Sequence, residues 1–204
     1  IHIDDIKNAK KLGYKIKLVS KSEIIEGQIY SVVEPTLIKI ESQLANVDNV
    51  LNGIIIETDH MDSLFLVGEG AGGKATASSI IADLFEIFKE TNYNSLGYRT
   101  NQLIDYQSIN YNSRTSSYYL RLQVKDIPGV LAKITSFLNE EGISIETILQ
   151  VPDKNNINLN REVPIIITTH ETKYNLLKES LIKIENLDFI ISKVGVINID
   201  KTIT

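Results

Sequence analysis

The sequence has no cysteine, only three histidines and no long apolar run, and each shortage narrows the chemistry it can perform. Without cysteine there is neither a disulfide framework nor thiolate chemistry. His2, His60 and His170 are separated from one another and from obvious carboxylate clusters, so we expect no metal site. No apolar run approaches the ~18 residues of a membrane helix, and no signal peptide is visible. A net charge of −5 argues against a nucleic-acid surface.

The size and the start of the chain suggest a folded piece of a larger molecule. With 204 residues, one or two domains are expected, and a hydrophobic fraction of 43% is enough for a buried core. The sequence begins with Ile1 and enters a patterned segment at once. We therefore expect that it was cut from a longer protein.

Residues 63–89 predict a strand, a glycine loop and a helix. Ser63–Val67 is an apolar run of strand length, and glycines follow at positions 68, 70, 72 and 73. Apolar residues then recur at helical spacing: Ile80, Ile81, Leu84, Phe85 and Phe88. Glycines let a ligand approach the backbone, and the helix that follows points unpaired N–H groups at it. The loop is interpreted either as a contact for a phosphate, carboxylate or cofactor, or as a tight turn between packed elements.

A self-contained nucleotide site is disfavoured, although the glycines match GxGxxG. A dinucleotide fold needs a second parallel strand that ends in an acidic residue about 20 residues later. Here the helix runs into the polar stretch TNYNSLGYRTNQ. A phosphate-binding P-loop would place Ser or Thr after Lys74, where Ala75 stands. Thr76 or Ser78 is the expected cap of the helix.

The first ninety residues predict an α+β arrangement with a mostly antiparallel sheet. A helix is expected over Ile3–Leu12, capped by Asp4 or Asp5. Alternating segments predict strands, with a break at Pro35 and a bulge at Gly53. The expected strands before the glycine loop cover residues 14–20, 24–33, 36–40 and 50–58.

Residues 91–117 are predicted to link two domains, one over 1–90 and the other over 118–204. Asparagines and tyrosines interleave there without steady periodicity. A segment of this length without regular elements is long for a compact domain. Its tyrosines suggest that the linker lies against another surface.

Residues 118–204 predict the order β-α-β-β-α-β of a ferredoxin-like fold. Helices with one apolar face begin near Val130 and Tyr174, and Pro152–Arg161 forms a polar loop. Both helices would cover one face of the sheet, so the other face needs a partner or solvent. The expected strands cover residues 118–124, 143–151, 163–169 and 189–199.

The segment Leu120–Gln150, LRLQVKDIPGVLAKITSFLNEEGISIETILQ, resembles an ACT domain. The resemblance implies a βαββαβ fold, pairing into side-by-side sheets, and binding of a small effector, usually an amino acid, at the interface. It also implies that the DxPGVL turn binds the effector. The matching residues are Asp126, Pro128, Gly129, Val130 and Leu131. A helix that begins at this turn offers free N–H groups to a carboxylate, although the turn could also serve only as a helix cap.

The first half resembles the substrate-binding region of homoserine dehydrogenase. The matching segments are DIKNAKKLGYKIKLVS, VEPTLI, SQLANVDNVLNGIII and VGEGAGGKATASSIIADL. The family interconverts homoserine and aspartate semialdehyde with NAD or NADP, at a branch leading to threonine, methionine and isoleucine. Members with such a tail are commonly inhibited by threonine. The resemblance therefore implies a cytoplasmic enzyme with threonine as the suspected effector.

By this resemblance Gly72 contacts the nicotinamide cofactor, and Thr76 lies just beyond it. The family's dinucleotide fold and its catalytic lysine and acidic residues precede the matched region, so we expect no catalytic residue in this chain. By itself it is expected to be inactive and to bind no cofactor. The helix after the glycine loop packs on the dinucleotide fold in the family, so here its apolar stripe should be exposed or find another partner.

The expected partners are an amino acid and a second copy of the chain, with neither nucleic acid nor membrane. The homodimer is expected to form through the ACT sheet, with the first-half sheet as a second candidate surface. An alternative is a free-standing ACT-type amino-acid sensor without enzymatic activity. A regulator that uses the first half as a scaffold for protein or DNA is disfavoured, because no basic helix or helix-turn-helix pattern is present.

Overall fold

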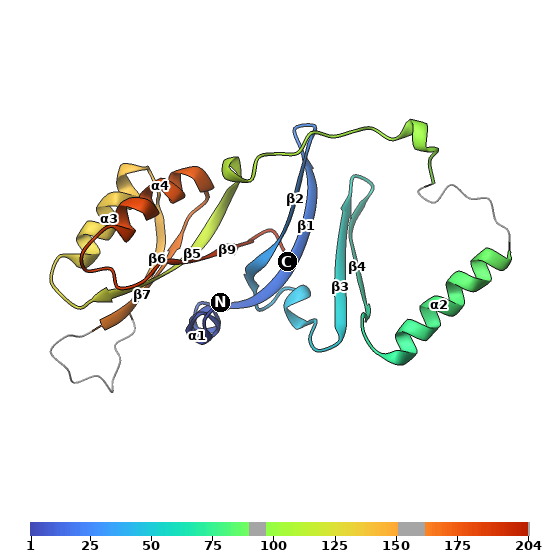
Figure 1. The fold of residues 1–204 in the computed structure, drawn as a ribbon, viewed down its shortest axis with the longest axis horizontal. Helices are drawn as coiled ribbons and strands as arrows, with labels where there is room; N and C mark the ends of the chain where they lie inside the picture. The colour runs from blue at the N-terminus through green and yellow to red at the C-terminus, as the bar shows by residue number, and fades with distance from the viewer. Residues whose placement is uncertain (90–96, 151–161, 204) are drawn as a thin grey trace. The chain divides into compact units, whose positions relative to one another are not determined.

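The computed structural model describes residues 1–89, 97–150 and 162–203 and confirms an α+β fold with mostly antiparallel sheets (Figure 1). The chain forms two compact units, one built from residues 1–40 and 108–203 and the other from residues 41–107. The first forty residues therefore pack with the second half of the chain. The polar loop predicted at Pro152–Arg161 and the start of the predicted linker lie outside the described residues.

The second half of the first unit has the predicted β-α-β-β-α-β order. Its sheet is antiparallel in the order β9-β5-β7-β6, and the short strand β8 pairs with the start of β5. The last strand, predicted over residues 189–199, is shorter than expected. The elements are β5 (Thr115–Lys125), α3 (Val130–Glu140), β6 (Ile145–Gln150), β7 (Glu162–Thr169), β8 (Thr172–Lys173), α4 (Tyr174–Glu185) and β9 (Gly195–Ile199).

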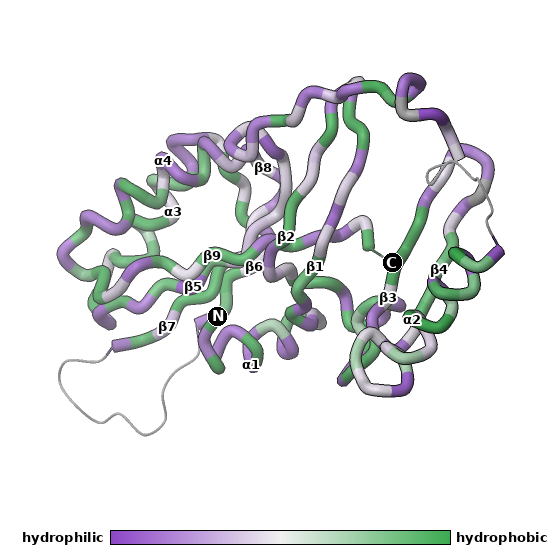
Figure 2. Tube along the Cα trace, turned by 45° about the vertical axis from the view of Figure 1, so that its right-hand side comes forward, coloured by the Kyte–Doolittle hydropathy of each residue, from purple (hydrophilic) through white to green (hydrophobic). Residues whose placement is uncertain are grey.

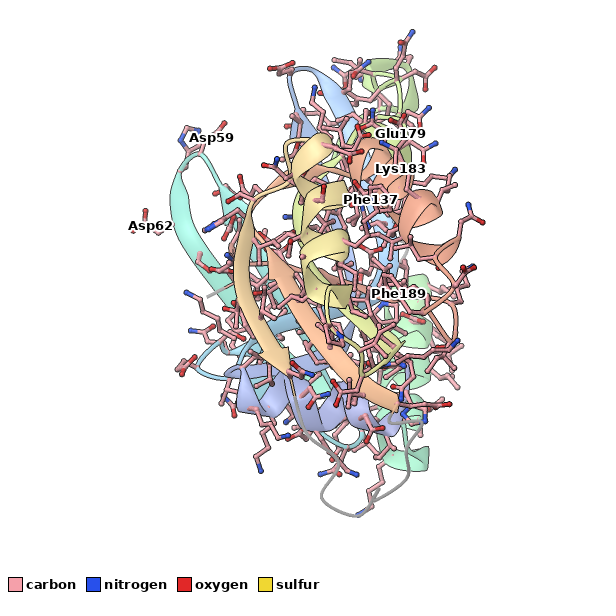
Figure 3. All side chains as sticks on the ribbon, turned by 90° about the vertical axis from the view of Figure 1, so that its left-hand side faces the viewer. Asp59, Asp62, Phe137, Glu179, Lys183 and Phe189 are labelled. Carbon is pink, nitrogen blue, oxygen red and sulfur yellow. The ribbon has the colours of Figure 1, made fainter. Side chains whose placement is uncertain are left out.

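Helices α3 and α4 cover one face of this sheet (Figure 1). Alternate residues of β5 point at the helices, and Ile134 of α3 and Leu177 of α4 are fully buried against them. Figure 3 shows Phe137 on α3 and Lys183 on α4. Lys183 Nζ lies 2.7 Å from Glu141 Oε1, just beyond the end of α3. The larger core among the described residues therefore lies between the two helices and the sheet, chiefly strands β5 and β7.

The first forty residues extend this sheet and cover its other face. They form helix α1 (Ile3–Lys11) and the strands β1 (Tyr14–Ile25) and β2 (Gln28–Lys39). Strand β2 pairs in parallel with β9 through Thr36 and Leu37. A second buried cluster joins Ala9 of α1 with Leu37, Tyr119, Ile166, Ile197 and Ile199. The face that the sequence left without a partner is thus covered by α1.

Strands β1 and β2 form one long hairpin rather than three extended pieces. Glu26 and Gly27 both have positive φ, 50° and 77°, and join the paired residues Ile25 and Gln28. Two such residues match the right-handed twist of a two-residue hairpin turn. The predicted break at Pro35 is wrong, because Pro35 lies within β2 opposite Leu18. β9 pairs only with the two residues that follow Pro35, and a proline is tolerated where one side of a strand is unpaired.

Helix α1 is anchored by Asp5, a buried carboxylate. Its Oδ1 accepts hydrogen bonds from Arg121 Nε at 2.6 Å and from the Tyr119 hydroxyl at 3.1 Å, both on β5. The predicted cap is corrected: the N-cap is His2, whose Nδ1 accepts from the Asp4 N–H at 3.3 Å. The His2 N–H donates to Asp5 Oδ2 at 2.6 Å. Asp5 therefore closes the first turn and also ties it to the sheet.

The second unit contains a two-stranded antiparallel sheet and one long helix. Gly53 pairs regularly with Val67, so the predicted bulge there is wrong; the irregularity lies between Ile56 and Thr58. A Cβ at Gly53 would lie 2.8 Å from a methyl group of Val47, which explains the glycine. The elements are the 3-10 turn Leu44–Asn46, β3 (Leu51–Thr58), β4 (Met61–Glu69), α2 (Gly73–Phe88) and the 3-10 turn Thr100–Gln102.

Candidate functional site

The glycine loop connects β4 to α2 and contains two positions that require glycine. Gly72 has φ +121° and is the N-cap of α2. A Cβ at Gly70 would lie only 1.5 Å from Asn52 Nδ2. The loop is therefore fixed by backbone geometry and by close packing on β3.

Neither Thr76 nor Ser78 caps helix α2, which corrects the sequence prediction. Thr76 lies inside the helix, and its hydroxyl donates to the Gly72 carbonyl oxygen at 3.0 Å. No side chain caps the first turn. The N–H groups at the start of this 16-residue helix are thus left for another acceptor.

The second predicted site is the turn between β5 and α3. Gly129 is the N-cap of α3 and has the left-handed φ of +91°, while Val130 is buried in the core. Leu131 is 37% exposed and Asp126 is exposed. No side chain caps α3, so its first N–H groups can receive a carboxylate.

The β5–α3 turn is held by backbone hydrogen bonds. The Ile127 N–H donates to the Lys125 carbonyl, and the Lys125 N–H donates to the Phe189 carbonyl, each at 3.0 Å. Pro128 fixes one further φ angle. The five residues predicted for effector binding therefore lie together at one end of the sheet, as parts of a preformed turn.

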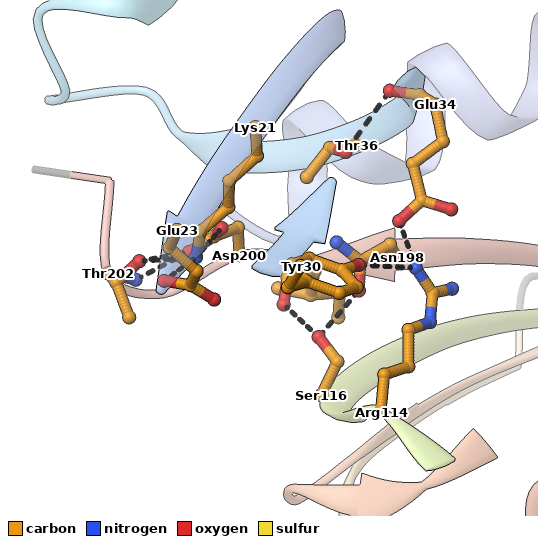
Figure 4. A network of polar contacts seen from close by, with 11 residues as sticks. Lys21, Glu23, Tyr30, Glu34, Thr36, Arg114, Ser116, Asn198, Asp200 and Thr202 are labelled. Atoms are coloured by element: carbon orange, nitrogen blue, oxygen red, sulfur yellow. Dashed lines mark hydrogen bonds and ion pairs between the residues drawn. The ribbon is translucent and has the colours of Figure 1, made fainter. Parts of the chain in front are cut away.

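A third group of polar side chains lies at the opposite end of β5 and was not predicted from the sequence (Figure 4). Arg114 forms an ion pair with Glu34 of β2, and its Nη1 donates to the Tyr30 hydroxyl at 3.2 Å. The Tyr111 hydroxyl donates to Glu34 Oε2 at 2.8 Å. Burial opposes the Arg114 charge, but the bonds to Glu34 and Tyr30 outweigh it and raise the Arg114 pKa.

Aromatic rings surround the buried Arg114 guanidinium. Its Cζ lies 4.0 Å from the ring centroid of Tyr111, 5.6 Å from that of Tyr118 and 5.3 Å from that of Tyr174. Cation–π contacts at these distances stabilise a desolvated guanidinium. Burial raises the pKa of Tyr118 to about 12, so its hydroxyl remains neutral beside Arg114. Tyr111 thus confirms for one tyrosine the prediction that residues 91–117 contact another surface.

A second ion pair, Lys21 with Asp200, lies beside the first (Figure 4). Lys21 Nζ lies 3.1 Å from Asp200 Oδ2 and 3.5 Å from Glu23 Oε2. The Thr202 hydroxyl donates to Asp200 Oδ1 at 2.6 Å. Burial opposes the Asp200 charge, but the bonds from Thr202 and the charge of Lys21 prevail and lower the Asp200 pKa.

The side chains of both ion pairs, Lys21 with Asp200 and Arg114 with Glu34, line a cavity of about 250 Å³ within the first unit. Its floor is one face of the β1–β2 hairpin, because Val19, Lys21 and Glu23 pair with Glu34, Val32 and Tyr30, and all six line the cavity. The walls come from β9 and from the segment that leads into β5, including Ile109, Arg114, Ser116, Asn198 and Asp200.

Neither a metal cluster nor a membrane-spanning helix is found in the described part of the chain. No group of three or more His, Asp or Glu side chains there could hold a metal ion. None of its helices is both long and apolar enough to cross a bilayer.

Comparison with known proteins gives a consistent result along the chain. Residues 1–85 match the family model for homoserine dehydrogenase, and residues 118–186 match that for the ACT domain. The homoserine dehydrogenases of Pseudomonas aeruginosa and Neisseria gonorrhoeae are each 34% identical, over 90% and 96% of this chain. A crystal structure of a homoserine dehydrogenase from Thiobacillus denitrificans matches 97% of the chain with 33% identity and a TM-score of 0.82.

The chain belongs to the homoserine dehydrogenase family. It spans 43% of the Pseudomonas aeruginosa enzyme, 46% of the Neisseria gonorrhoeae enzyme and 45% of the solved Thiobacillus denitrificans chain. The chain therefore spans less than half the length of these homoserine dehydrogenases.

The two matched regions meet within one sheet. The glycine loop lies in the homoserine dehydrogenase match, and the β5–α3 turn lies in the ACT match. Strand β2 belongs to the first match, yet it pairs with β9 of the ACT fold. The sequence signals found the two turns because glycine and proline mark them locally. No local signal marks Arg114, whose partner Glu34 is 80 residues away in sequence.

Proposed function

We propose that this chain is the C-terminal part of a homoserine dehydrogenase that carries its amino-acid-binding regulatory domain. The intact enzyme would interconvert L-homoserine and L-aspartate 4-semialdehyde with NAD or NADP, in the synthesis of threonine, methionine and isoleucine. The observation that supports this most is that α1 and β1–β2, from the family-matched region, pack into the ACT sheet. An effector that changes the ACT sheet therefore acts directly on a part of the enzyme.

The cofactor side of the proposal rests on the glycine loop. A Cβ placed at Gly72 would meet no atom within 4 Å, and the first turn of α2 has no side-chain cap. Backbone N–H groups and open space suit a polar edge of a nicotinamide ring. Gly72 would hold that edge, and Thr76 fixes the loop through its bond to the Gly72 carbonyl. The cofactor, when bound, accepts or supplies the hydride.

The effector side rests on the β5–α3 turn. The carboxylate of an amino acid would accept from the free N–H groups at Val130 and Leu131, where the helix dipole also favours negative charge. The exposed carboxylate of Asp126 would pair with the ammonium group. Gly129 keeps the turn in the left-handed conformation that directs these N–H groups outward. Threonine is the first effector to test.

The experiment is thermal unfolding of the chain with a panel of amino acids, threonine foremost. A ligand at about 100 times its dissociation constant adds ~2.7 kcal/mol to the free energy of unfolding. We expect stabilisation by threonine and its loss in Asp126→Asn. Glu179→Gln, which removes an exposed carboxylate on α4 (Figure 3), should respond like the unmodified chain. Equal stabilisation of both variants, or none of the unmodified chain by any amino acid, would contradict an effector site at the turn.

The glycine loop favours the dehydrogenase proposal over a free-standing amino-acid sensor. A sensor needs only the ACT fold, whereas residues 68–88 form a glycine loop with a positive φ at Gly72 and a helix with an exposed apolar face. The chain alone is expected to produce no homoserine-dependent NADH or NADPH, because the catalytic lysine and acidic residues of the family precede the matched region. Measurable turnover by the chain alone would contradict the expectation that it contains no catalytic residue.

We also propose a homodimer through the open edge of the ACT sheet. Edge β9 is occupied by β2, whereas β6 pairs only with β7 among the described residues. Exposed strand edges pair readily with a second copy. Light scattering should give the mass of a dimer. Ile148→Lys on β6 should lower the measured mass towards that of a monomer, whereas Leu18→Lys on β1 should leave it unchanged. A monomer at high concentration would contradict this proposal.

A further inference from the structure

We infer that the cavity between the β1–β2 hairpin and the β5–β9 edge is a binding site for a small primary amine with a short aliphatic part. This site is separate from the effector turn. The turn follows Lys125 at the end of β5, whereas the cavity is lined by Thr115 and Ser116 at its start. At ~3.3 Å per residue, the two ends lie about 30 Å apart.

The charges around the cavity select a cation. Lys21 and Arg114 face three carboxylates, those of Glu23, Glu34 and Asp200, which leaves one negative charge in excess. Both cations are already paired inside the cavity, Lys21 with Asp200 and Arg114 with Glu34. An anion would meet cations that are already neutralised and carboxylates that repel it. An ammonium group would restore neutrality.

Glu23 is the carboxylate best placed to receive the ammonium group. It is 41% exposed at its side chain, and its distance to Lys21 Nζ is 3.5 Å, longer than the bond between Lys21 and Asp200. Tyr30 is paired with Glu23 across the hairpin and also lines the cavity. Its ring offers a π-face for the same cation. The two side chains together form an acidic and aromatic corner.

The rest of the lining sets the size and polarity of the ligand. Val19, Val32 and Ile109 supply an apolar surface, which suits a short alkyl group. The volume of about 250 Å³ is just below the range of drug-sized ligand pockets, roughly 300–1,000 Å³. This volume favours a monoamine of a few carbon atoms over a nucleotide.

The site would act at the join between the two matched regions. Its floor comes from the homoserine dehydrogenase match, and its walls include Ser116, Asn198 and Asp200, which lie on either side of the ACT match in sequence. Ser116 Oγ donates to Asn198 Oδ1 at 2.5 Å, which fixes the wall where β5 meets β9. An amine bound there contacts both parts and stabilises their pairing. This role is independent of amino-acid binding at the β5–α3 turn.

The test is an NMR titration of the ¹⁵N-labelled chain with n-butylamine, n-butanol and butyrate. We expect n-butylamine to give saturable shifts at the amides of Tyr30, Ser116 and Asn198, without shifts at Gly129. Glu23→Gln should weaken binding about tenfold, the loss of one charge-assisted contact. Glu23→Lys should abolish it. Glu26→Gln, at the exposed hairpin turn outside the cavity, should leave it unchanged.

Each alternative outcome overturns the inference. Equal shifts with n-butanol would show that the charge of the ligand does not matter. Shifts that do not saturate would show that the amine does not bind at a specific site. Unchanged affinity in both Glu23 variants, with native spectra, would show that Glu23 does not bind the ammonium group. Shifts at Gly129 alone would assign amine binding to the turn. None of these results depends on whether threonine binds, so failure of the amine site and failure of the proposed function are distinguishable.

Discussion

The two units of this chain bury their apolar residues very differently. The first has two buried clusters, one on each face of a six-stranded sheet path. In the described part of the second, only Ser42 and Ala45 are buried. Helix α2 has no buried residue, and Phe88 is 87% exposed. Figure 2 shows apolar stretches along α2 that match those of the core helices in hydropathy.

The difference teaches that an amphipathic sequence does not ensure a buried face. Ile80, Leu84 and Phe88 of α2 have the same four-residue spacing as Val130, Ile134 and Leu138 of α3, yet only the α3 residues are covered. The sequence predicted that the apolar face of α2 would either be exposed or find another partner. In the structure this face is exposed. An exposed apolar face of this kind marks an interaction surface.

The largest expected effect separates the two helices. Ile134→Ala on α3 should lower the free energy of unfolding by about 4 kcal/mol, because it opens a cavity in a closed core. Ile81→Ala on α2 is the matched change at a position that is 53% exposed and should cost less than about 0.5 kcal/mol. Urea denaturation followed by tyrosine fluorescence measures the first change, and hydrogen exchange of α2 measures the second. Equal losses would show that α2 is buried in solution.

The next effect tests the ion pair between Glu34 of β2 and Arg114, just before β5. Glu34→Gln leaves the Arg114 guanidinium buried without its carboxylate and should cost about 3 kcal/mol. Glu41→Gln removes an exposed carboxylate and should change stability by less than about 0.5 kcal/mol. Urea midpoints of the two variants give the comparison. A small loss for Glu34→Gln would mean that the hairpin does not depend on this pair.

Two neighbouring glycines test the loop of the second unit. Gly72→Ala forces a residue with a Cβ to keep φ +121° and should cost about 1–2 kcal/mol locally. Gly73→Ala lies within the first turn of α2 and should instead stabilise the helix by about 0.5–1 kcal/mol. Hydrogen exchange of the α2 amides measures the local stability of the helix in both variants. The same sign for both variants would contradict the strain assigned to Gly72.

The smallest expected effect is a pH dependence of the first unit. The folded pKa of Asp200 lies below its unfolded value, so its stabilisation is complete above the ordinary pKa of about 4. It is lost as the pH falls through the lower, folded pKa. Asp200→Asn should therefore lower stability at pH 7 by about 1 kcal/mol and narrow the difference between pH 7 and pH 2. Asp188→Asn, which removes an exposed carboxylate, is the control. If the free energy of unfolding of Asp200→Asn depended on pH as in the unmodified chain, Asp200 would not contribute to acid destabilisation.

Local pattern sufficed for much of the fold and for two of the three candidate sites. Alternation and helical spacing predicted the order β-α-β-β-α-β. Gly72 and Gly129 were singled out by the family resemblances, and both have the positive φ that favours glycine. The errors concern neighbours in space. Pro35 was expected to end a strand, because its position beside the unpaired side of β2 is not visible in sequence.

The sequence by itself determined the element types, the two glycine turns and the family resemblance, because these depend on residues close together in the chain. Only the tertiary structure placed α1 and the β1–β2 hairpin on the ACT sheet. That placement rests on Asp5 with Arg121, on Glu34 with Arg114, and on two residue pairs between β2 and β9. Each contact joins residues 80 or more positions apart. Such contacts follow from the packing of whole elements, and no local periodicity encodes them.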